Sequence, residues 1–131
     1  MTERPLSPHL SVYRMYRYTL LTSITNRATG IVLSAGLILL VYWLVAIASG
    51  ASAYHHARAV LSLGVLKAIY VILLATFSYH LFAGVRHLIW DTGAGLERAQ
   101  SKRSAAFVVI ASVLLFVGLA WWALHAGGRA P

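Results

Sequence analysis

Three long stretches of this chain carry no Asp, Glu, Lys or Arg, and they limit its possible folds more than any other feature. They cover residues 28–57, 68–85 and 104–128. A helix needs about 20 apolar residues to cross a bilayer, with a range of about 17–25. A helix also satisfies its own backbone hydrogen bonds in lipid, which a lone strand does not. The sequence therefore predicts an all-α membrane protein with three transmembrane helices, at about 21–49, 63–90 and 104–125, in a single domain of residues 1–131.

The composition and the charge distribution agree with a membrane location. Hydrophobic residues make up 60% of the chain and charged residues 11%, too few for the polar surface of a small soluble domain. The net charge of +8 does not form a basic run interleaved with aromatic residues, so no nucleic-acid partner is expected. The basic residues instead follow the positive-inside rule, which predicts the N-terminus inside and the C-terminus outside. The inner group is Arg4, Arg14, Arg17, Arg27, Arg86, Arg98, Lys102 and Arg103, and the outer group is Arg58, Lys67 and Arg129.

The segments between the predicted spans are short. Residues 1–20 contain two prolines and interleaved tyrosines and arginines, which favours a segment packed at the membrane surface or on a partner. We expect residues 50–62 to form an outer loop, residues 91–95 a turn and residues 96–103 a charged inner loop.

His80 lies inside the second predicted span, where an ionisable side chain is costly and therefore indicates a function. In a helix, His80, Gly84, His87 and Asp91 are spaced i, i+4, i+7 and i+11, close to one face. An imidazole can ligate a haem iron, and Gly84 removes a side chain where the flat ring would lie. The alternative is a neutral histidine that hydrogen-bonds to a neighbouring helix.

Arg86 and His87 follow His80 at a separation of about 9–10 Å along a helix axis. This separation is comparable with the distance from a haem iron to its propionates, so both residues are candidate propionate partners. Asp91 lies near the end of the same helix, where a carboxylate opposes the helix dipole. We therefore expect Asp91 to pair with His87 or Arg86.

The histidines also predict a partner chain. His80 and His87 lie on the same side of any ring packed on this helix, so they cannot both be axial ligands. The other histidines are at positions 9, 55, 56 and 125, and none of them lies deep within a predicted span. A second axial histidine would therefore come from another chain, either a different subunit or a second copy. Cysteine is absent, so this chain holds no iron–sulfur cluster through thiolates.

Ser23 and Arg27 lie one helical turn apart at the inner end of the first span. A hydroxyl and a cation in a poorly solvated site would stabilise the charge that a quinone carbonyl gains on reduction. The alternative is an arginine that reaches the membrane surface beside a capping serine. The two residues alone leave both interpretations open.

Three motifs cover nearly the whole chain and point to a known family. They are Arg4-Pro5-Leu6-Ser7-Pro8-His9-Leu10, the segment Ser23 to Gly30, and His80 with Gly84, Arg86, His87 and Asp91. In their order and spacing they resemble the cytochrome b subunit of succinate dehydrogenase, the larger membrane anchor of respiratory complex II.

The resemblance implies a role for each candidate residue. His80 would be an axial ligand of one haem b, with the second axial histidine on the small membrane anchor subunit. Gly84 would face this haem, Arg86 and His87 would lie around its propionates, and Ser23 and Arg27 would contribute to the ubiquinone pocket near the iron–sulfur subunit. Succinate oxidation would occur on the flavoprotein subunit. This chain would then be a non-flavin membrane subunit of succinate:ubiquinone oxidoreductase, in the respiratory chain and the tricarboxylic acid cycle.

One position departs from the family pattern. The family usually has a histidine directly before the arginine of the second motif, and this chain has Asn26. Asparagine can hydrogen-bond but cannot titrate, so a charged or proton-delivering group is not expected there. The first motif starts at Arg4, which leaves no room for a mitochondrial transit peptide and predicts the bacterial cytoplasmic (inner) membrane.

Two other functions fit the sequence less well. A haem-free structural anchor of an oxidoreductase would need His80 only for helix packing. This function does not explain why Gly84, Arg86 and His87 follow His80 at their spacing. A small transporter or channel would usually carry a carboxylate within its spans, and no Asp or Glu lies in any of the three.

Overall fold

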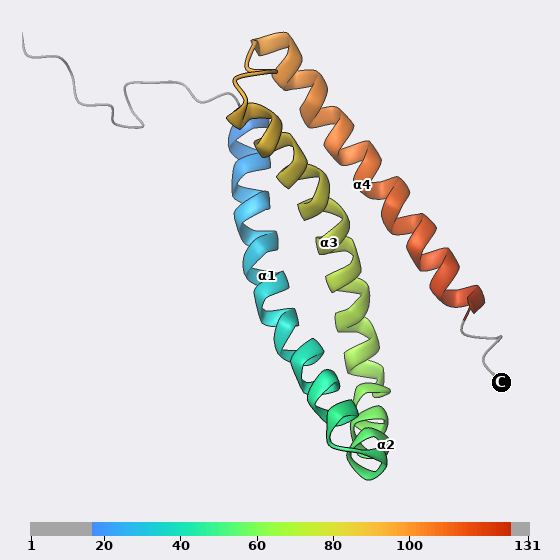
Figure 1. Ribbon diagram of the computed structural model, residues 1–131. Coiled ribbons are helices and arrows are strands. Elements are labelled where there is room, and N and C mark those ends of the chain that lie inside the picture. Colours follow the sequence, from blue (N-terminus) through green and yellow to red (C-terminus); the bar gives the residue numbers. More distant parts are fainter. Residues whose placement is uncertain (1–16, 127–131) are drawn as a thin grey trace, which may run out of the picture.

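The described part of the chain is entirely helical. The computed structural model describes residues 17–126, and in this range it contains four helices and no strand. They are α1 (Arg17–Ala48), α2 (Ala51–Leu61), α3 (Gly64–Asp91) and α4 (Arg98–Ala126). Helices α1, α3 and α4 are long and apolar enough to cross a membrane, which confirms the prediction of three spans (Figure 1).

Helices α1 and α4 begin before their predicted spans, whereas α3 matches its predicted span to within one residue at each end. The 28 residues of α3 reach about 42 Å at about 1.5 Å per residue, more than the hydrocarbon thickness of about 30 Å. Helix α4 begins at Arg98, so the residues expected to form a charged inner loop form its first turns instead. The predicted turn at 91–95 is confirmed, and Gly93 and Gly95 have φ angles of 82° and 75° there, which favour glycine.

The expectation of a loop at residues 50–62 was wrong, because this segment contains helix α2. Four of its eleven residues are alanine, the strongest helix former. Gly50, with a φ of 99°, makes the sharp turn from α1 into α2. A search for spans overlooks such a helix, because it is too short and too polar to cross a membrane.

Part of the predicted organisation lies outside the described residues. The structure describes only the last four residues of the expected interfacial segment 1–20, and these form the start of α1. The motif from Arg4 to Leu10, including His9, and the outer residue Arg129 are not among the described residues.

Helix α3 is the centre of the bundle. It packs against α1 on one side and against α4 on the other, whereas α1 and α4 meet less extensively. The start of α1, the end of α3 and the start of α4 lie at the same end of the molecule (Figure 1). From this end α4 slants away from α3 (Figure 1). The three spans are therefore closest together at the end where Arg86 binds Thr22 of α1 and Ser101 of α4.

Small side chains make up most of the buried positions. They are Ala46, Ala57, Ser78, Ala83, Ser101, Ala105 and Ser112, with Val108 and Arg86 as the larger members. Large apolar residues such as Ile31, Leu114 and Leu124 are exposed instead. Lipid solvates these large side chains, so helices in a membrane associate through close contacts between small residues. The Phe82 and Phe107 rings add an edge-to-face contact between α3 and α4, with centroids 6.1 Å apart.

Candidate functional site

His80 on α3 is attached to α1 through one of its ring nitrogens. Its Nδ1 lies 3.1 Å from Thr29 Oγ1 and 3.2 Å from the Asn26 carbonyl oxygen. The Thr29 hydroxyl itself donates to the same carbonyl at 2.9 Å. A carbonyl oxygen can only accept a hydrogen bond, so this arrangement requires the proton on Nδ1. In this tautomer Nε2 carries a free lone pair, the form in which a histidine ligates a metal.

His80 is also one of the residues that line an open groove between α1 and α3. The groove has a volume of about 650 Å³ and is lined by Gly30, Ser34, Gly36, Leu73, Phe77 and His80, among others. Its lining runs from Gly30 to Leu40 on α1 and from Tyr70 to His80 on α3, two helices that run in opposite directions. His80 and Gly30 therefore lie together at one end of it. Nε2 makes no hydrogen bond with any described residue and remains the available atom at this end.

Two glycines near His80 have different surroundings. A Cβ atom at Gly30 would lie 3.2 Å from His80 Cε1, so the missing side chain allows α1 to approach the ring closely. A Cβ atom at Gly84 would meet no atom within 4 Å. Packing of the described residues therefore gives no reason for glycine at position 84. Glycine in a helix costs about 1 kcal/mol relative to alanine, so an occupant outside the described chain would account for it.

Arg86 is buried where the three long helices meet, with an exposure of only 4%. Its Nε donates to Ser104 Oγ at 2.9 Å and its Nη1 to Thr22 Oγ1 at 3.0 Å. Its Nη2 donates to the Ser101 carbonyl oxygen at 3.0 Å and to Ser101 Oγ at 3.2 Å. The guanidinium also lies over the Trp90 ring, 3.9 Å from its centroid. Arg86 therefore ties α1 and α4 to α3, a contact that the sequence alone did not predict.

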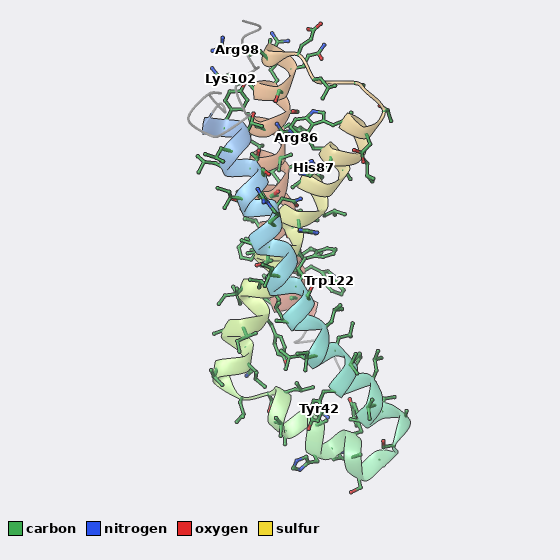
Figure 2. The ribbon with its side chains drawn as sticks, turned by 90° about the vertical axis from the view of Figure 1, so that its left-hand side faces the viewer. Tyr42, Arg86, His87, Arg98, Lys102 and Trp122 are labelled. Atoms are coloured by element: carbon green, nitrogen blue, oxygen red, sulfur yellow. The ribbon has the colours of Figure 1, made fainter. Side chains whose placement is uncertain are left out.

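His87 and Asp91 occupy more open positions on the same helix. Figure 2 shows Arg86 and His87 in the half of the molecule that also carries Arg98 and Lys102, with Tyr42 toward the opposite end. The His87 ring contacts the Trp90 ring edge-to-face, at 5.5 Å between centroids, and forms no hydrogen bond with a described residue. The expected pairing of Asp91 with His87 or Arg86 was wrong for the described chain, because the Arg86 donors are directed to Thr22 and to α4.

Ser23 and Arg27 lie together on the outer surface of α1. Arg27 Nη2 donates to Ser23 Oγ at 3.4 Å, and the arginine is exposed. This is the geometry expected for residues one helical turn apart. Arg27 belongs to the same turn as Asn26 and Thr29, which hold His80. The two polar clusters, about fifty residues apart in the sequence, thus lie against each other at one end of α1 and α3.

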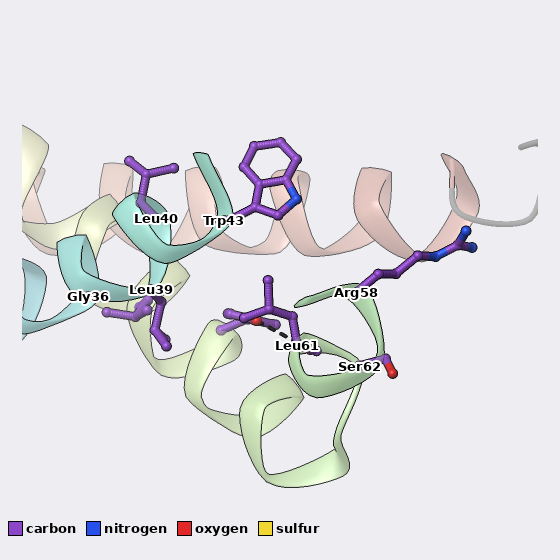
Figure 3. Close-up of a pocket in the computed structure, with 9 residues that line it drawn as sticks. Gly36, Leu39, Leu40, Trp43, Arg58, Leu61 and Ser62 are labelled. Atoms are coloured by element: carbon purple, nitrogen blue, oxygen red, sulfur yellow. Dashed lines mark hydrogen bonds between the residues drawn. The ribbon is translucent and has the colours of Figure 1, made fainter. Parts of the chain in front are cut away.

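A second hollow, of about 500 Å³, lies farther along the same two helices and against α2 (Figure 3). Its lining is mostly apolar, with Gly36, Leu40, Tyr70 and Leu73 shared with the groove beside His80. Figure 3 shows the Arg58 side chain extending away from it. The Tyr70 hydroxyl donates to the Leu61 carbonyl at 3.2 Å. No histidine lines this hollow, so His80 remains the better centre for a functional site.

The donor set of the described residues suits haem better than a bare metal ion. No three His, Asp or Glu side chains of residues 17–126 lie close enough together to hold a metal ion. One imidazole with a free Nε2, a groove beside it and an unexplained glycine one turn away fit a ring whose iron takes single axial ligands. Asn26 Oδ1 is buried without a hydrogen-bond partner, which leaves an unsatisfied polar atom beside the residues that hold His80.

Comparison with known proteins gives a consistent family. The model of the succinate dehydrogenase/fumarate reductase transmembrane subunit family matches residues 1–119. The chain is 41% identical over 114 residues to the succinate dehydrogenase cytochrome b556 subunit of Paracoccus denitrificans, covering 87% of each chain. It is 40% identical over 125 residues to the mitochondrial cytochrome b560 subunit of Sus scrofa, covering 91% of this chain and 71% of the relative. It is 33% identical over 113 residues to the b556 subunit of Rickettsia felis, covering 86% of this chain and 87% of the relative.

Replacing the buried arginine tests whether it joins the three long helices. Arg86→Met should lower the free energy of unfolding by about 2–4 kcal/mol, because hydrogen bonds to a charged group contribute about 1.5–3 kcal/mol each and burying the charge offsets part of this gain. Thermal melting of the detergent-solubilised complex measures the loss. The matched control is Arg58→Met, which removes an exposed arginine on α2 and should change stability by less than about 0.5 kcal/mol. Equal melting temperatures for both variants would contradict the role of Arg86.

Proposed function

This chain belongs to the succinate dehydrogenase cytochrome b subunits, the membrane anchors of respiratory complex II, and on this basis we propose that it binds haem b through His80 and contributes to a ubiquinone-reduction site. The observation that carries the haem proposal is the state of the His80 ring. Its Nδ1 is held by α1, and its Nε2 is free beside the groove. A metal-ligating histidine commonly donates its other ring N–H to a carbonyl oxygen, as His80 does.

The residues around His80 would hold the haem in place. When bound, haem supplies a centre that accepts and releases one electron. Gly84 leaves the helix face open one turn from the ligand, and the groove lining is mainly apolar, which suits the macrocycle. His87 has free ring nitrogens for a propionate. Arg86 adds a positive charge nearby, although most of its donors already bond within this chain.

We propose that the haem is shared with the small membrane anchor subunit. Among the described residues, the histidines other than His80 and His87 lie at positions 55, 56 and 125, on α2 and at the far end of α4. None of these can face His80 across one ring. Since none of the described histidines can take this place, we propose that the second axial histidine comes from the small anchor, as the family resemblance implies. The iron–sulfur and flavoprotein subunits would complete the complex, with succinate oxidised on the flavoprotein.

Ser23 and Arg27 would form this chain's part of the ubiquinone site. The guanidinium and the hydroxyl already lie side by side and are accessible. Donors oriented before the reaction stabilise negative charge on a quinone oxygen without having to reorganise. Their position on the α1 turn that also holds His80 would place the quinone head close to the haem.

We further propose a bacterial cytoplasmic membrane location with the N-terminus inside. The exposed residues Arg98, Lys102 and Arg103 lie at the junction of α3 and α4, at the end where α1 begins. The opposite end carries only Arg58 and Lys67 among the described basic residues. This distribution supports the orientation through the positive-inside rule.

Removing the proposed ligand tests the haem assignment. His80→Ala should abolish or strongly alter the b-type reduced-minus-oxidised spectrum of the purified complex and lower its haem content in a pyridine haemochrome assay. The control is His125→Ala, which removes an exposed histidine that stacks on Trp121 at the far end of α4 and should leave the spectrum unchanged. An unaltered spectrum in His80→Ala would favour the haem-free structural anchor instead.

Removing the arginine that is proposed to bind the quinone should separate two activities of the complex. Arg27→Ala should lower succinate-to-ubiquinone activity by about 10- to 100-fold, because a hydrogen bond to a charged group contributes about 1.5–3 kcal/mol. Succinate oxidation with a soluble dye should be spared. Arg58→Ala, an exposed arginine at the other end of the bundle, is the control for both assays. An equal loss of both activities in Arg27→Ala would reject the quinone role.

The absence of cysteine makes the orientation directly testable. Glu97→Cys places a thiol before α4, and Ser52→Cys places one at the start of α2, both at exposed positions. A membrane-impermeant maleimide added to intact cells should label this chain in the second variant but not in the first. The unmodified chain serves as the unlabelled control, and labelling of only the first variant would reverse the proposed orientation.

A further inference from the structure

Thr29 occupies a central place in the contacts of His80. Its hydroxyl hydrogen goes to the Asn26 carbonyl at 2.9 Å, and its oxygen lies 3.1 Å from His80 Nδ1. The same Nδ1 lies 3.2 Å from the Asn26 carbonyl oxygen. The three polar atoms therefore form a closed triangle in which one proton comes from Thr29 and one from His80.

Of the two neutral tautomers of His80, only one satisfies this triangle. If Thr29 donated to an unprotonated Nδ1, the nitrogen lone pair would also face the carbonyl oxygen of Asn26, and the two would repel each other. If Thr29 donates to the Asn26 carbonyl, the Thr29 oxygen is free to accept a hydrogen bond. The Nδ1–H of His80 is then shared between this oxygen and the Asn26 carbonyl oxygen. The second arrangement makes every close contact favourable and leaves Nε2 unprotonated.

We propose that Thr29 is a positioning residue for His80. Together with the Asn26 carbonyl, its hydroxyl oxygen accepts from Nδ1–H and holds the ring with Nε2 available to the haem iron. This inference rests on the proposed haem function and adds a residue on another helix. An acceptor that binds the N–H of a ligating imidazole orients the ring and raises its basicity. A more basic imidazole stabilises ferric over ferrous iron, so the hydroxyl should lower the midpoint potential of the haem.

The neighbouring residue supports the same role. Gly30 follows Thr29 and has no side chain where a Cβ would lie 3.2 Å from His80 Cε1. The turn therefore offers a hydroxyl and a carbonyl to one nitrogen of the ring and leaves space for the carbon beside it.

The test compares three substitutions at position 29 in the assembled complex. Thr29→Val removes the hydroxyl with little change in shape and should raise the midpoint potential in an optical redox titration. We expect a threefold to tenfold change in the ferrous-to-ferric ratio at fixed potential, where a tenfold change corresponds to about 59 mV for a one-electron couple. Thr29→Ser keeps the hydroxyl and should titrate close to the wild type. If Thr29→Val does not assemble, Thr29→Ala removes the hydroxyl without placing a methyl group beside Nδ1 and carries the same expectation.

A matched control and the His80 variant separate the possible failures. Thr25 is an exposed residue of the same helix, and its hydroxyl lies by Tyr79 and makes no hydrogen bond to His80, so Thr25→Val should not move the potential. If the wild-type complex contains no haem, or His80→Ala keeps the wild-type spectrum, the proposed function itself fails. If haem depends on His80 but the assembled hydroxyl-free variant titrates at the wild-type potential, only the role of Thr29 is overturned. A serine variant shifted as far as the valine variant would overturn it as well.

Discussion

Helices in lipid gain little from burying apolar side chains against each other, because the surrounding acyl chains are equally apolar. The spans of this chain are therefore held by small buried residues and by a few polar contacts. Two of these contacts join helices that are distant in the sequence: His80 to the α1 turn at Asn26 and Thr29, and Arg86 to Thr22 and α4. The described bundle is organised around these two contacts on α3.

Both contacts lie toward the same end of the molecule, and the candidate site residues lie with them. Helix α4 slants away from α3 toward the other end, and an open groove runs along α1 and α3 from His80 in that direction. The end at which Arg86 joins the three long helices by hydrogen bonds is also the end that carries Ser23 and Arg27. A site built there has a rigid support within this chain and an open side for a ligand or a partner subunit.

The sequence predicted the features that depend on local composition. The three spans and the turn at 91–95 follow from apolar length and glycine content, and the structure contains them. Helix α2 was missed because its helical character comes from alanine rather than from an apolar run. The contacts between helices could not be predicted from the sequence, because the spacing of residues along α3 does not reveal which residues of α1 face it. Thr29 was therefore overlooked. Asp91 was expected to pair with His87 or Arg86, whereas Arg86 in fact binds serine and threonine oxygens.

The same contacts bear on whether His80 is a packing residue or a ligand. A packing role accounts for Nδ1, which joins α3 to α1, but it gives no reason for a free Nε2 beside a groove. It also gives no reason for Gly84, where an added Cβ atom would meet no described atom within 4 Å and where glycine weakens the helix by about 1 kcal/mol relative to alanine. Haem bound at Nε2 would explain both features together. The two roles of His80 would then be compatible, because one ring nitrogen would serve the fold and the other the cofactor.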